Sequence, residues 1–455
     1  MADCSKIRIQ LRDGAIYASK QGDIIRARGV RYARATRFQP PQPIEPWAGI
    51  VDCTSPASIC PQLPSRLEAL NGAITAGHVM SEDCLHVSVC APATTKPETT
   101  PTTLLPVIAF LHGGGYTSGG GDLDVYSGAD LAAAGAGVVY VGITHRLGIL
   151  GYQPIQGTAP GNLGLLDQMA ALRWIRDNVG RFGGDAQQIT LAGASAGADS
   201  IYCLFAADGG ETLFRRAILQ SAPLGVRRMD RRAMVEALDH AAQDALGGGG
   251  GGPADAAATP DELLRVQKKL ALASRGFEAL LMPFAPTLGY APLCISESEF
   301  TARVQRALAR IPLFIGYCRD EGVAFEAIFN GIHSDARPAI PTTTTSSVAD
   351  FISRSWFQND ADRLWEQACA AGGDPWFYEL AVAPAGSPFK AAHTMEMAFI
   401  LGGWHAWKNA PMLKGSDAEA LVKTVGAEVK KLWVAFARGE DLGRTRFRID
   451  EHFQI

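Results

Sequence analysis

One serine lies between two glycines in a context that could make it a nucleophile. Residues 193–197 read Gly-Ala-Ser-Ala-Gly, with Ser195 at the centre. They follow an apolar segment, residues 188–192, that is typical of a strand, and they open a segment that is typical of a helix. Such a tight strand-to-helix turn strains the serine backbone and leaves room only for small neighbours. The pattern predicts a nucleophile elbow, with the serine hydroxyl exposed above a sheet.

A glycine run earlier in the chain could stabilise the charge that such a serine generates. Residues 112–116 read His-Gly-Gly-Gly-Tyr and come directly after the apolar run 106–111. Attack on a carbonyl carbon places negative charge on its oxygen, and glycines let backbone N–H groups approach that oxygen without hindrance from side chains. The run lies 83 residues before Ser195. Together the two motifs indicate acyl transfer through a serine.

A serine nucleophile also needs an acid that orients its base. In a fold with this kind of elbow, the acid and then the base follow the serine along the chain. Asp320 and Glu321 stand just behind the apolar segment 311–317, so we expect both at the carboxyl end of a strand. The residue pattern alone leaves the choice between them open.

Four histidines follow these carboxylates and are candidates for the base. His393 lies in an expected loop between the strand 377–383 and the apolar helix 395–401, and we favour it for that reason. Of the other three, His333 lies close behind the acid's strand, His405 lies between tryptophans on an expected helix, and His452 lies near the end of the chain.

The elements that must position these residues change in character along the chain. Short alternating strands are expected at 6–11 and 15–19, around the turn signal Asp13-Gly14, and at 85–90. From residue 106 onward, short apolar runs alternate with helical periodicity, as in parallel sheets that are buried on both faces. The expected strands are 106–111, 138–143, 188–192, 216–219, 311–317 and 377–383, and the long helices are 163–182 and 418–437. This order predicts an α/β fold in which helices flank a mostly parallel central sheet, preceded by short antiparallel strands.

Composition argues against several other classes of protein. The 455 residues are 47% hydrophobic and 19% charged, and the net charge is −4. This mild acidic balance gives no electrostatic reason to expect nucleic acid or an anionic membrane as a partner. No apolar run approaches the roughly 18 to 20 residues of a membrane span. The polar N-terminus and the absence of an N-x-Ser/Thr acceptor favour a cytoplasmic protein, and no feature indicates an oligomeric state.

Several further segments carry a resemblance to a known family. They are Arg37-Phe38-Gln39-Pro40-Pro41, Trp47, Cys60-Pro61-Gln62, Ser81-Glu82-Asp83-Cys84-Leu85, Phe182-Gly183-Gly184-Asp185, Asp320-Glu321-Gly322, and His393 through Glu396 with Phe399. With them the chain, as one domain 1–455, resembles the type-B carboxylesterase and cholinesterase family of α/β-hydrolases nearly from end to end. The resemblance implies Ser195 as nucleophile, His393 as base and Glu321 as acid.

The same resemblance implies further parts of the site. It places the oxyanion donors at the backbone N–H groups of Gly114, Gly115 and Ala196, and it implies no cofactor or metal. Cys60 and Cys84 resemble the family's first disulfide. We also expect four residues near the family's pocket positions to contact the substrate: Tyr116, Leu224, Met282 and Phe284.

Departures from the family bear on the substrate. Ala194 stands where family members usually have glutamate, and Thr394 stands where glycine is usual. Residues 222–283, with a glycine-rich loop at 247–252, look like a shortened cap region. The segment between Cys60 and Cys84 contains no aromatic residue that could hold a choline cation.

We therefore expect a serine carboxylesterase that acts on a neutral ester with an uncharged alcohol part, through an acyl-enzyme. One alternative is a serine acyltransferase or cyclising enzyme that uses the same triad with a bound alcohol or amine in place of water. A catalytically silent binding relative is disfavoured, because all three triad residues are present.

Overall fold

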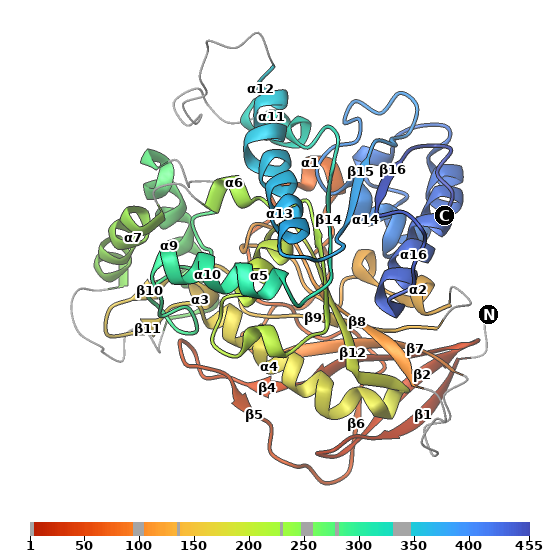
Figure 1. Cartoon of the computed structure of the whole chain (residues 1–455). Coiled ribbons are helices and arrows are strands. Elements are labelled where there is room, and N and C mark those ends of the chain that lie inside the picture. The colour runs from red at the N-terminus through yellow and green to blue at the C-terminus, as the bar shows by residue number, and fades with distance from the viewer. Residues whose placement is uncertain are drawn as a thin grey trace.

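The computed structural model describes residues 4–93, 104–133, 137–227, 231–246, 258–277, 282–330 and 347–455. Its main feature is a 12-stranded sheet with the order β1-β2-β3-β7-β9-β8-β12-β13-β14-β15-β16, and β6 pairs with β2 (Figure 1). This is the expected α/β-hydrolase arrangement. It brings the ends of strands that are distant in sequence to one edge, where the candidate residues lie.

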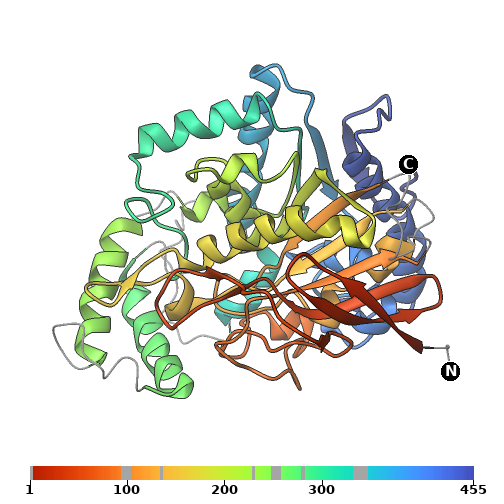
Figure 2. The same ribbon diagram turned by 90° about the horizontal axis from the view of Figure 1, so that it is seen from below.

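The N-terminal part of the sheet is antiparallel. These strands and their bounds are β1 (Cys4–Gln10), β2 (Ala15–Gln21), β3 (Ile24–Arg31), β6 (Ile50–Asp52) and β7 (His86–Pro92). β1 pairs with β2, β2 with β3 and β3 with β7 in antiparallel register, and only β6 lies parallel to its neighbour β2. Figure 2 shows these strands together at one edge of the sheet. The prediction of short antiparallel strands at the start of the chain is confirmed.

From β9 onward the sheet is parallel. The strands are β9 (Val139–Ile143), β8 (Leu105–Leu111), β12 (Gly184–Ala194), β13 (Arg216–Gln220), β14 (Leu313–Cys318), β15 (Trp376–Leu380) and β16 (Arg446–Ile449). Their apolar runs are continuous because both faces are covered. In β8, Ala109 belongs to one hydrophobic core, whereas Ile108 and Phe110 belong to the other.

Helices cover the two faces of the sheet separately. α4 (Leu163–Asn178) and α5 (Ala196–Leu204) supply Leu172 and Ile201 to the first core. α14 (Met395–Ile400) and α16 (Ala418–Arg438) supply Phe399 and Trp433 to the second core and pack against each other (Figure 1). The expected helix 163–182 ends at Asn178, and a 3₁₀ turn, η2 (Val179–Phe182), completes it.

Shorter elements fill the connections. They are α1 (Glu68–Asn71), η1 (Asp124–Tyr126), α2 (Ala129–Ala133), α3 (Gly148–Gly151), η3 (Gly210–Thr212), η4 (Ser274–Gly276), α10 (Glu297–Leu308), α11 (Gly322–Asn330), α12 (Val348–Ile352), the π-helix η7 (Ser353–Gln358), α13 (Asn359–Ala370), α15 (Gly403–Trp407) and η8 (Pro411–Leu413). Among the described residues, two small strand pairs lie outside the main sheet: β4 (Ala33–Arg34) with β5 (Gln42–Pro43), and β10 (Pro154–Ile155) with β11 (Ala159–Pro160).

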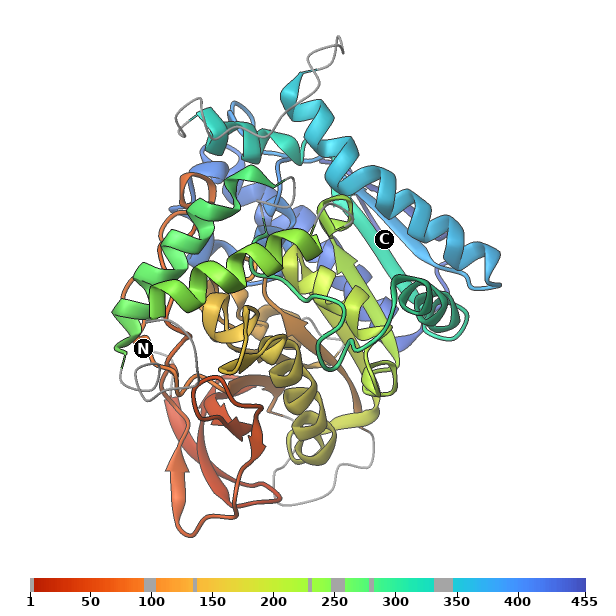
Figure 3. The ribbon, with the colours of Figure 1, turned by 90° about the vertical axis from the view of Figure 1, so that its left-hand side faces the viewer.

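The described residues of the segment expected to be a shortened cap include three α-helices. These are α6 (Leu224–Arg227), α7 (Arg231–Leu246) and α9 (Pro260–Ala273), and α7 and α9 lie side by side (Figure 3). α9 begins with a capping box, in which Thr259 and Glu262 satisfy each other's backbone N–H groups. The glycine-rich loop expected at 247–252 lies outside the described residues. Among the residues that the structure describes, no helix is long and apolar enough to cross a membrane.

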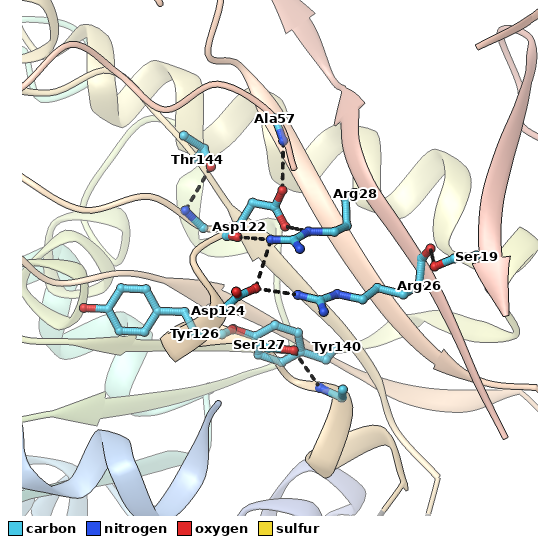
Figure 4. A network of polar contacts seen from close by, with 12 residues as sticks. Ser19, Arg26, Arg28, Ala57, Asp122, Asp124, Tyr126, Ser127, Tyr140 and Thr144 are labelled. Carbon is cyan, nitrogen blue, oxygen red and sulfur yellow. Dashed lines mark hydrogen bonds and ion pairs between the residues drawn. The ribbon is translucent and has the colours of Figure 1, made fainter. Parts of the chain in front are cut away.

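A partly buried polar network connects the antiparallel strands to the segment behind the glycine run (Figure 4). The guanidinium of Arg28, on β3, donates to the carboxylate of Asp122 at 2.8 Å and to the Asp122 carbonyl at 2.7 Å. The other carboxylate oxygen of Asp122 accepts the N–H of Ala57 at 3.0 Å. Gly121, one residue earlier, donates to the Thr144 hydroxyl at 2.9 Å. The network therefore holds the end of the glycine loop against two neighbouring parts of the fold.

Candidate active site

Ser195 stands on the sharp turn between β12 and α5. Its φ of 55° and ψ of −122° lie in a region that a residue with a side chain rarely adopts. Glycine is required at positions 193 and 197 because other backbone atoms lie too close there for a side chain. A Cβ on Gly193 would lie 2.5 Å from the carbonyl carbon of Gly197, and a Cβ on Gly197 would lie 2.0 Å from the carbonyl oxygen of Leu111. The geometry is that of the expected nucleophile elbow.

A chain of hydrogen bonds leads from Ser195 to a buried carboxylate. The imidazole Nε2 of His393 lies 2.9 Å from the Ser195 hydroxyl, and its Nδ1 lies 2.5 Å from Oε2 of Glu321. The second oxygen of Glu321 accepts the backbone N–H of Cys318 at 2.9 Å. His393 and Glu321 are fully buried, whereas Ser195 retains a small exposed surface. The structure thus brings together three residues that lie far apart in the sequence.

The neighbouring carboxylate faces elsewhere. Asp320 accepts the guanidinium of Arg319 at 3.0 Å and the backbone N–H of Ala391 at 3.2 Å. Its side chain is 21% exposed, whereas that of Glu321 is 0% exposed. The sequence pattern left open which of these two acids orients the base. In the structure, Glu321 and not Asp320 contacts the imidazole of His393.

Electrostatics favour a basic imidazole at this position. Burial by itself lowers the pKa of His393, but the charge of Glu321 and its hydrogen bond outweigh burial and raise the pKa above that of an ordinary histidine. Phe325 and Phe357 pack against the ring, with centroids 5.2 Å and 4.8 Å away. These contacts fix the ring plane, so Nε2 stays directed at the serine.

A second buried carboxyl lies behind this chain. The Ser221 hydroxyl donates to Oε1 of Glu396 at 2.8 Å, and the Cys318 thiol donates to Oε2 at 2.6 Å. Burial, followed by the charge of Glu321, raises the pKa of Glu396. From the sequence we used Glu396 only as a family landmark. Its place three residues after His393, at the start of an expected helix, is the signal in the sequence that it lies close to that histidine.

The glycine run presents backbone donors beside Ser195. Gly114 and Gly115 have φ angles of 115° and 60°, and a Cβ on Gly114 would lie 2.1 Å from the Ser118 carbonyl oxygen. Both glycines line the same cavity as Ser195. Within the described part of the chain, the N–H groups of Gly114, Gly115 and Ala196 donate to no protein acceptor. They are therefore available to an oxygen atom held next to the serine.

Buried side chains hold this loop from behind. The Gln62 amide donates to the Gly119 carbonyl at 2.8 Å and accepts the Gly119 N–H at 2.6 Å. His112 and His145 stack with their centroids 4.7 Å apart, and burial lowers the pKa of each, that of His112 to about 4. His145 is buried between His112 and Tyr152.

The disulfide implied by the family resemblance is not formed. Cys60 and Cys84 are buried free thiols, and the hydrogen bond that the Cys84 thiol donates to Cys60, together with burial, raises the pKa of Cys84. The sulfur of Cys60 also accepts the backbone N–H of Leu147 at 3.3 Å. The two sulfurs are therefore adjacent and have hydrogen-bond partners in the reduced form.

A largely apolar cavity, called the chamber below, opens at Ser195. Its described lining residues are Ser65, Arg66, Leu67, Gly114, Gly115, Ser195, Pro223, Val226, Met282, Phe325, Ile328, Trp356, Phe357 and His393. Trp356 and Phe357 come from η7, a π-helix of the kind that often occurs at functional sites. No pattern in the sequence had marked this wall, because a π-helix has no distinctive periodicity over six residues.

Only one of the four side chains expected at the substrate lies on the chamber wall. Met282 lines it, whereas Leu224 and Phe284 are buried in the first core. The Tyr116 hydroxyl donates to the Asp199 carboxylate at 2.6 Å, away from the chamber. Gly114 and Gly115 line the chamber just before Tyr116, and Pro223 and Val226 line it on either side of Leu224, so neighbours in one segment face opposite ways.

A smaller compartment, called the polar compartment below, lies on another side of Ser195. Its described lining residues are Ser65, Leu67, Asn71, Ile74, Thr75, Gly113, Gly114, Ser118, Gly119, Tyr126, Ala194, Ser195, Thr394 and Met397. Thr394 adopts a φ of 75°, and its hydroxyl donates to Oδ1 of Asn71 at 2.9 Å. Thr394 thus keeps the left-handed conformation that glycine would adopt more readily.

Known proteins are similar to this chain in sequence and in fold. A family model described as the carboxylesterase family matches residues 12–337. The chain belongs to the carboxylesterase family. It is 36% identical over 424 residues to a "probable N-octanoylanthranilate hydrolase" of Rhodococcus erythropolis, covering 91% of this chain and 89% of that relative. It is 32% identical over 451 residues to a para-nitrobenzyl esterase of Bacillus subtilis (strain 168), covering 93% and 88%.

Solved structures support the same fold. A PNB esterase superposes on this carboxylesterase with a TM-score of 0.81 and 24% identity, over 98% of this chain and 96% of that one. A thermophilic PNB esterase gives a TM-score of 0.80 at 25% identity, with the same coverage. Family membership and the hydrolase relatives identify the enzyme as a carboxylic ester hydrolase.

Proposed function

We propose that this enzyme is a serine carboxylesterase that works through an acyl-enzyme. The observation that carries the proposal is the unbroken chain from Glu321 through His393 to the Ser195 hydroxyl, with backbone donors beside it. His393 takes the serine proton as the hydroxyl oxygen attacks the ester carbonyl. The charged Glu321 stabilises the imidazolium that forms and keeps the second ring nitrogen toward the serine.

The remaining steps use the same groups. The carbonyl oxygen becomes an oxyanion, and the free N–H groups of Gly114, Gly115 and Ala196 support a role as its donors. His393 then gives its proton to the departing alcohol, and the acyl group stays on Ser195. Water attacks the acyl-enzyme and gives a proton to His393. His393 then returns that proton to the Ser195 oxygen as its bond to the acyl carbon breaks, and the acid product leaves.

The chamber supports an apolar acyl group in the substrate. Val226, Met282 and Phe325 are among its lining residues, and burial of each CH₂ group of an acyl chain against such side chains favours binding by about 0.8 kcal/mol. The name of the Rhodococcus relative describes an eight-carbon acyl group on anthranilate. We propose an acyl chain of medium length, on an ester whose alcohol part carries no positive charge.

Turnover of p-nitrophenyl esters from acetate to octanoate tests this function. Ser195→Ala should lower kcat by up to about 10⁶, leaving only the contributions of the oxyanion donors and of binding. A folded Ser195→Ala variant with nearly full activity would overturn the proposal. Added alcohols then separate hydrolysis from acyl transfer. If ester products replace the free acid at millimolar alcohol, the acyltransferase alternative is correct.

A further inference from the structure

A single arginine stands out on the chamber wall. Among the described residues that line the chamber, Arg66 is the only one with a permanent charge, and most of the others are apolar. It comes from the segment just before α1 and lies between Ser65 and Leu67, which line the chamber as well. A positive charge on the wall of a mostly apolar chamber, beside Ser195, attracts an anionic group on a bound substrate.

The side chain of Arg66 is exposed to solvent and lines the chamber, so a group on a bound substrate can reach it. Next to apolar side chains a charge–charge contact is stronger than on an open surface, because less solvent screens it.

We propose that Arg66 binds a carboxylate carried by the substrate, so that the enzyme prefers esters with a negative charge away from the scissile bond. This inference rests on the proposed esterase function and specifies its substrate class. The ester group that reacts stays neutral, and the charge belongs to a substituent.

Arginine is suited to this task. Its planar guanidinium presents five N–H donors in a fork that matches the two oxygens of a carboxylate. Arg66 also has an interaction within the protein, so an incoming carboxylate shares or replaces that contact. The same positive charge disfavours a cationic substrate, which agrees with the absence of an aromatic residue between Cys60 and Cys84.

Matched pairs of phenyl esters test the proposal and locate the carboxylate. The first pair is 3-(octanoyloxy)benzoate and its methyl ester, which place the charge, or its neutral counterpart, on the alcohol part. The second pair is the monophenyl ester of octanedioic acid and phenyl octanoate, which place it on the acyl part. We expect kcat/KM for the charged member of one pair to exceed that of its neutral counterpart by about 10- to 100-fold, the range for a hydrogen bond to a charged group.

Substitution at Arg66 should remove that preference selectively. Arg66→Met should lower kcat/KM for the preferred carboxylate substrate by about 10- to 100-fold and should leave the neutral ester within about threefold of wild type. Arg66→Lys, which keeps the charge without the fork, should retain part of the preference. Arg232→Met is the matched control, because Arg232 is an exposed arginine on α7 that pairs with Glu236 and its loss changes the net charge equally.

Three results would overturn the proposal. They are equal kcat/KM for both members of each pair in the wild type, equal loss on charged and neutral esters in Arg66→Met, and an equal effect of Arg232→Met. A different result would show that the proposed esterase function itself is wrong. In that case Ser195→Ala would leave the turnover of the neutral esters intact.

Discussion

The catalytic centre and the chamber beside it are held in place by different kinds of contact. In the centre, Ser195, His393 and Glu321 form hydrogen bonds of 2.5 to 2.9 Å, each of which depends on one donor and one acceptor. On the chamber wall, side chains such as Val226 and Phe357 are held by packing alone. A directional chain fails when one atom changes, whereas a packed wall changes its volume gradually. Substitutions in the centre should therefore have much larger effects than substitutions on the wall.

Replacing Glu321 should cause the largest loss short of removing the nucleophile or base. Glu321→Gln keeps the shape but can present an N–H to the imidazole and favour the wrong tautomer, so kcat should fall by about 10⁴. In the wild type, kcat/KM should rise with pH as His393 loses its proton. The midpoint should lie above about 6.5, because Glu321 raises the pKa of His393. In Glu321→Gln, burial remains without that charge, so the midpoint should move to lower pH.

Asp320→Asn is the matched control for this prediction. The asparagine can still accept the backbone N–H of Ala391, and the contact with Arg319 is partly exposed. Its kcat/KM for p-nitrophenyl acetate should stay within about threefold of wild type, with an unchanged pH profile. An equal loss in both variants would contradict the assignment of Glu321, and not Asp320, as the residue that orients His393 by accepting its Nδ1–H.

Filling the chamber should shorten the acyl chains that the enzyme accepts. Val226 lies on α6, is buried and lines the chamber, so Val226→Phe directs additional volume toward the bound acyl group. We expect kcat/KM for p-nitrophenyl octanoate to fall by about 10- to 100-fold, and that for the acetate to fall by less than about threefold. A uniform loss over the whole acyl series, with an unchanged melting temperature, would place the acyl chain elsewhere.

The difference between a choline ester and a neutral ester of similar size should be smaller than the effects predicted above. A cation over an aromatic face gains about 2 kcal/mol when desolvated, which corresponds to roughly 30-fold. The polar compartment has Ala194 where a glutamate would attract the cation, and Tyr126 is the one aromatic side chain among its described lining residues. The neutral 3,3-dimethylbutyl thioacetate should therefore be hydrolysed at least as efficiently as acetylthiocholine, measured as kcat/KM. A clear preference for the choline ester would assign a cation site to Tyr126.

The smallest effects are expected at the hydrogen bond between Thr394 and Asn71, two residues that line the polar compartment. Asn71→Ala removes the acceptor of the buried Thr394 hydroxyl and should cost about 1 kcal/mol, or about 1–3 °C in melting temperature. Thr394→Gly loses the same bond but relieves the left-handed backbone, so its melting temperature should be at least that of Asn71→Ala. In the Thr394→Gly background, Asn71→Ala should cost less than it does alone. Equal costs in both backgrounds would show that the hydrogen bond contributes nothing.

The sequence predicted the strands of the sheet more reliably than the residues that line the chamber. The apolar run 106–111 identified β8 to within one residue, because a strand buried on both faces carries its signal in consecutive side chains. The residues that line the chamber could not be identified from the sequence in this way. Leu224 and Val226 lie two residues apart in one short helix, and only Val226 lines the chamber.

The sequence by itself determined the nucleophile elbow and the glycine run. Both depend on local steric requirements, and a close backbone approach such as that of Gly197 to Leu111 accepts only glycine. The tertiary structure decided which acid contacts the base and that the chamber contains Arg66. His393 is 72 residues from Glu321 and 198 from Ser195, and neighbouring residues such as Asp320 and Glu321 look equivalent until the fold directs one of them inward. Long-range packing sets those directions, and no short stretch of sequence contains that information.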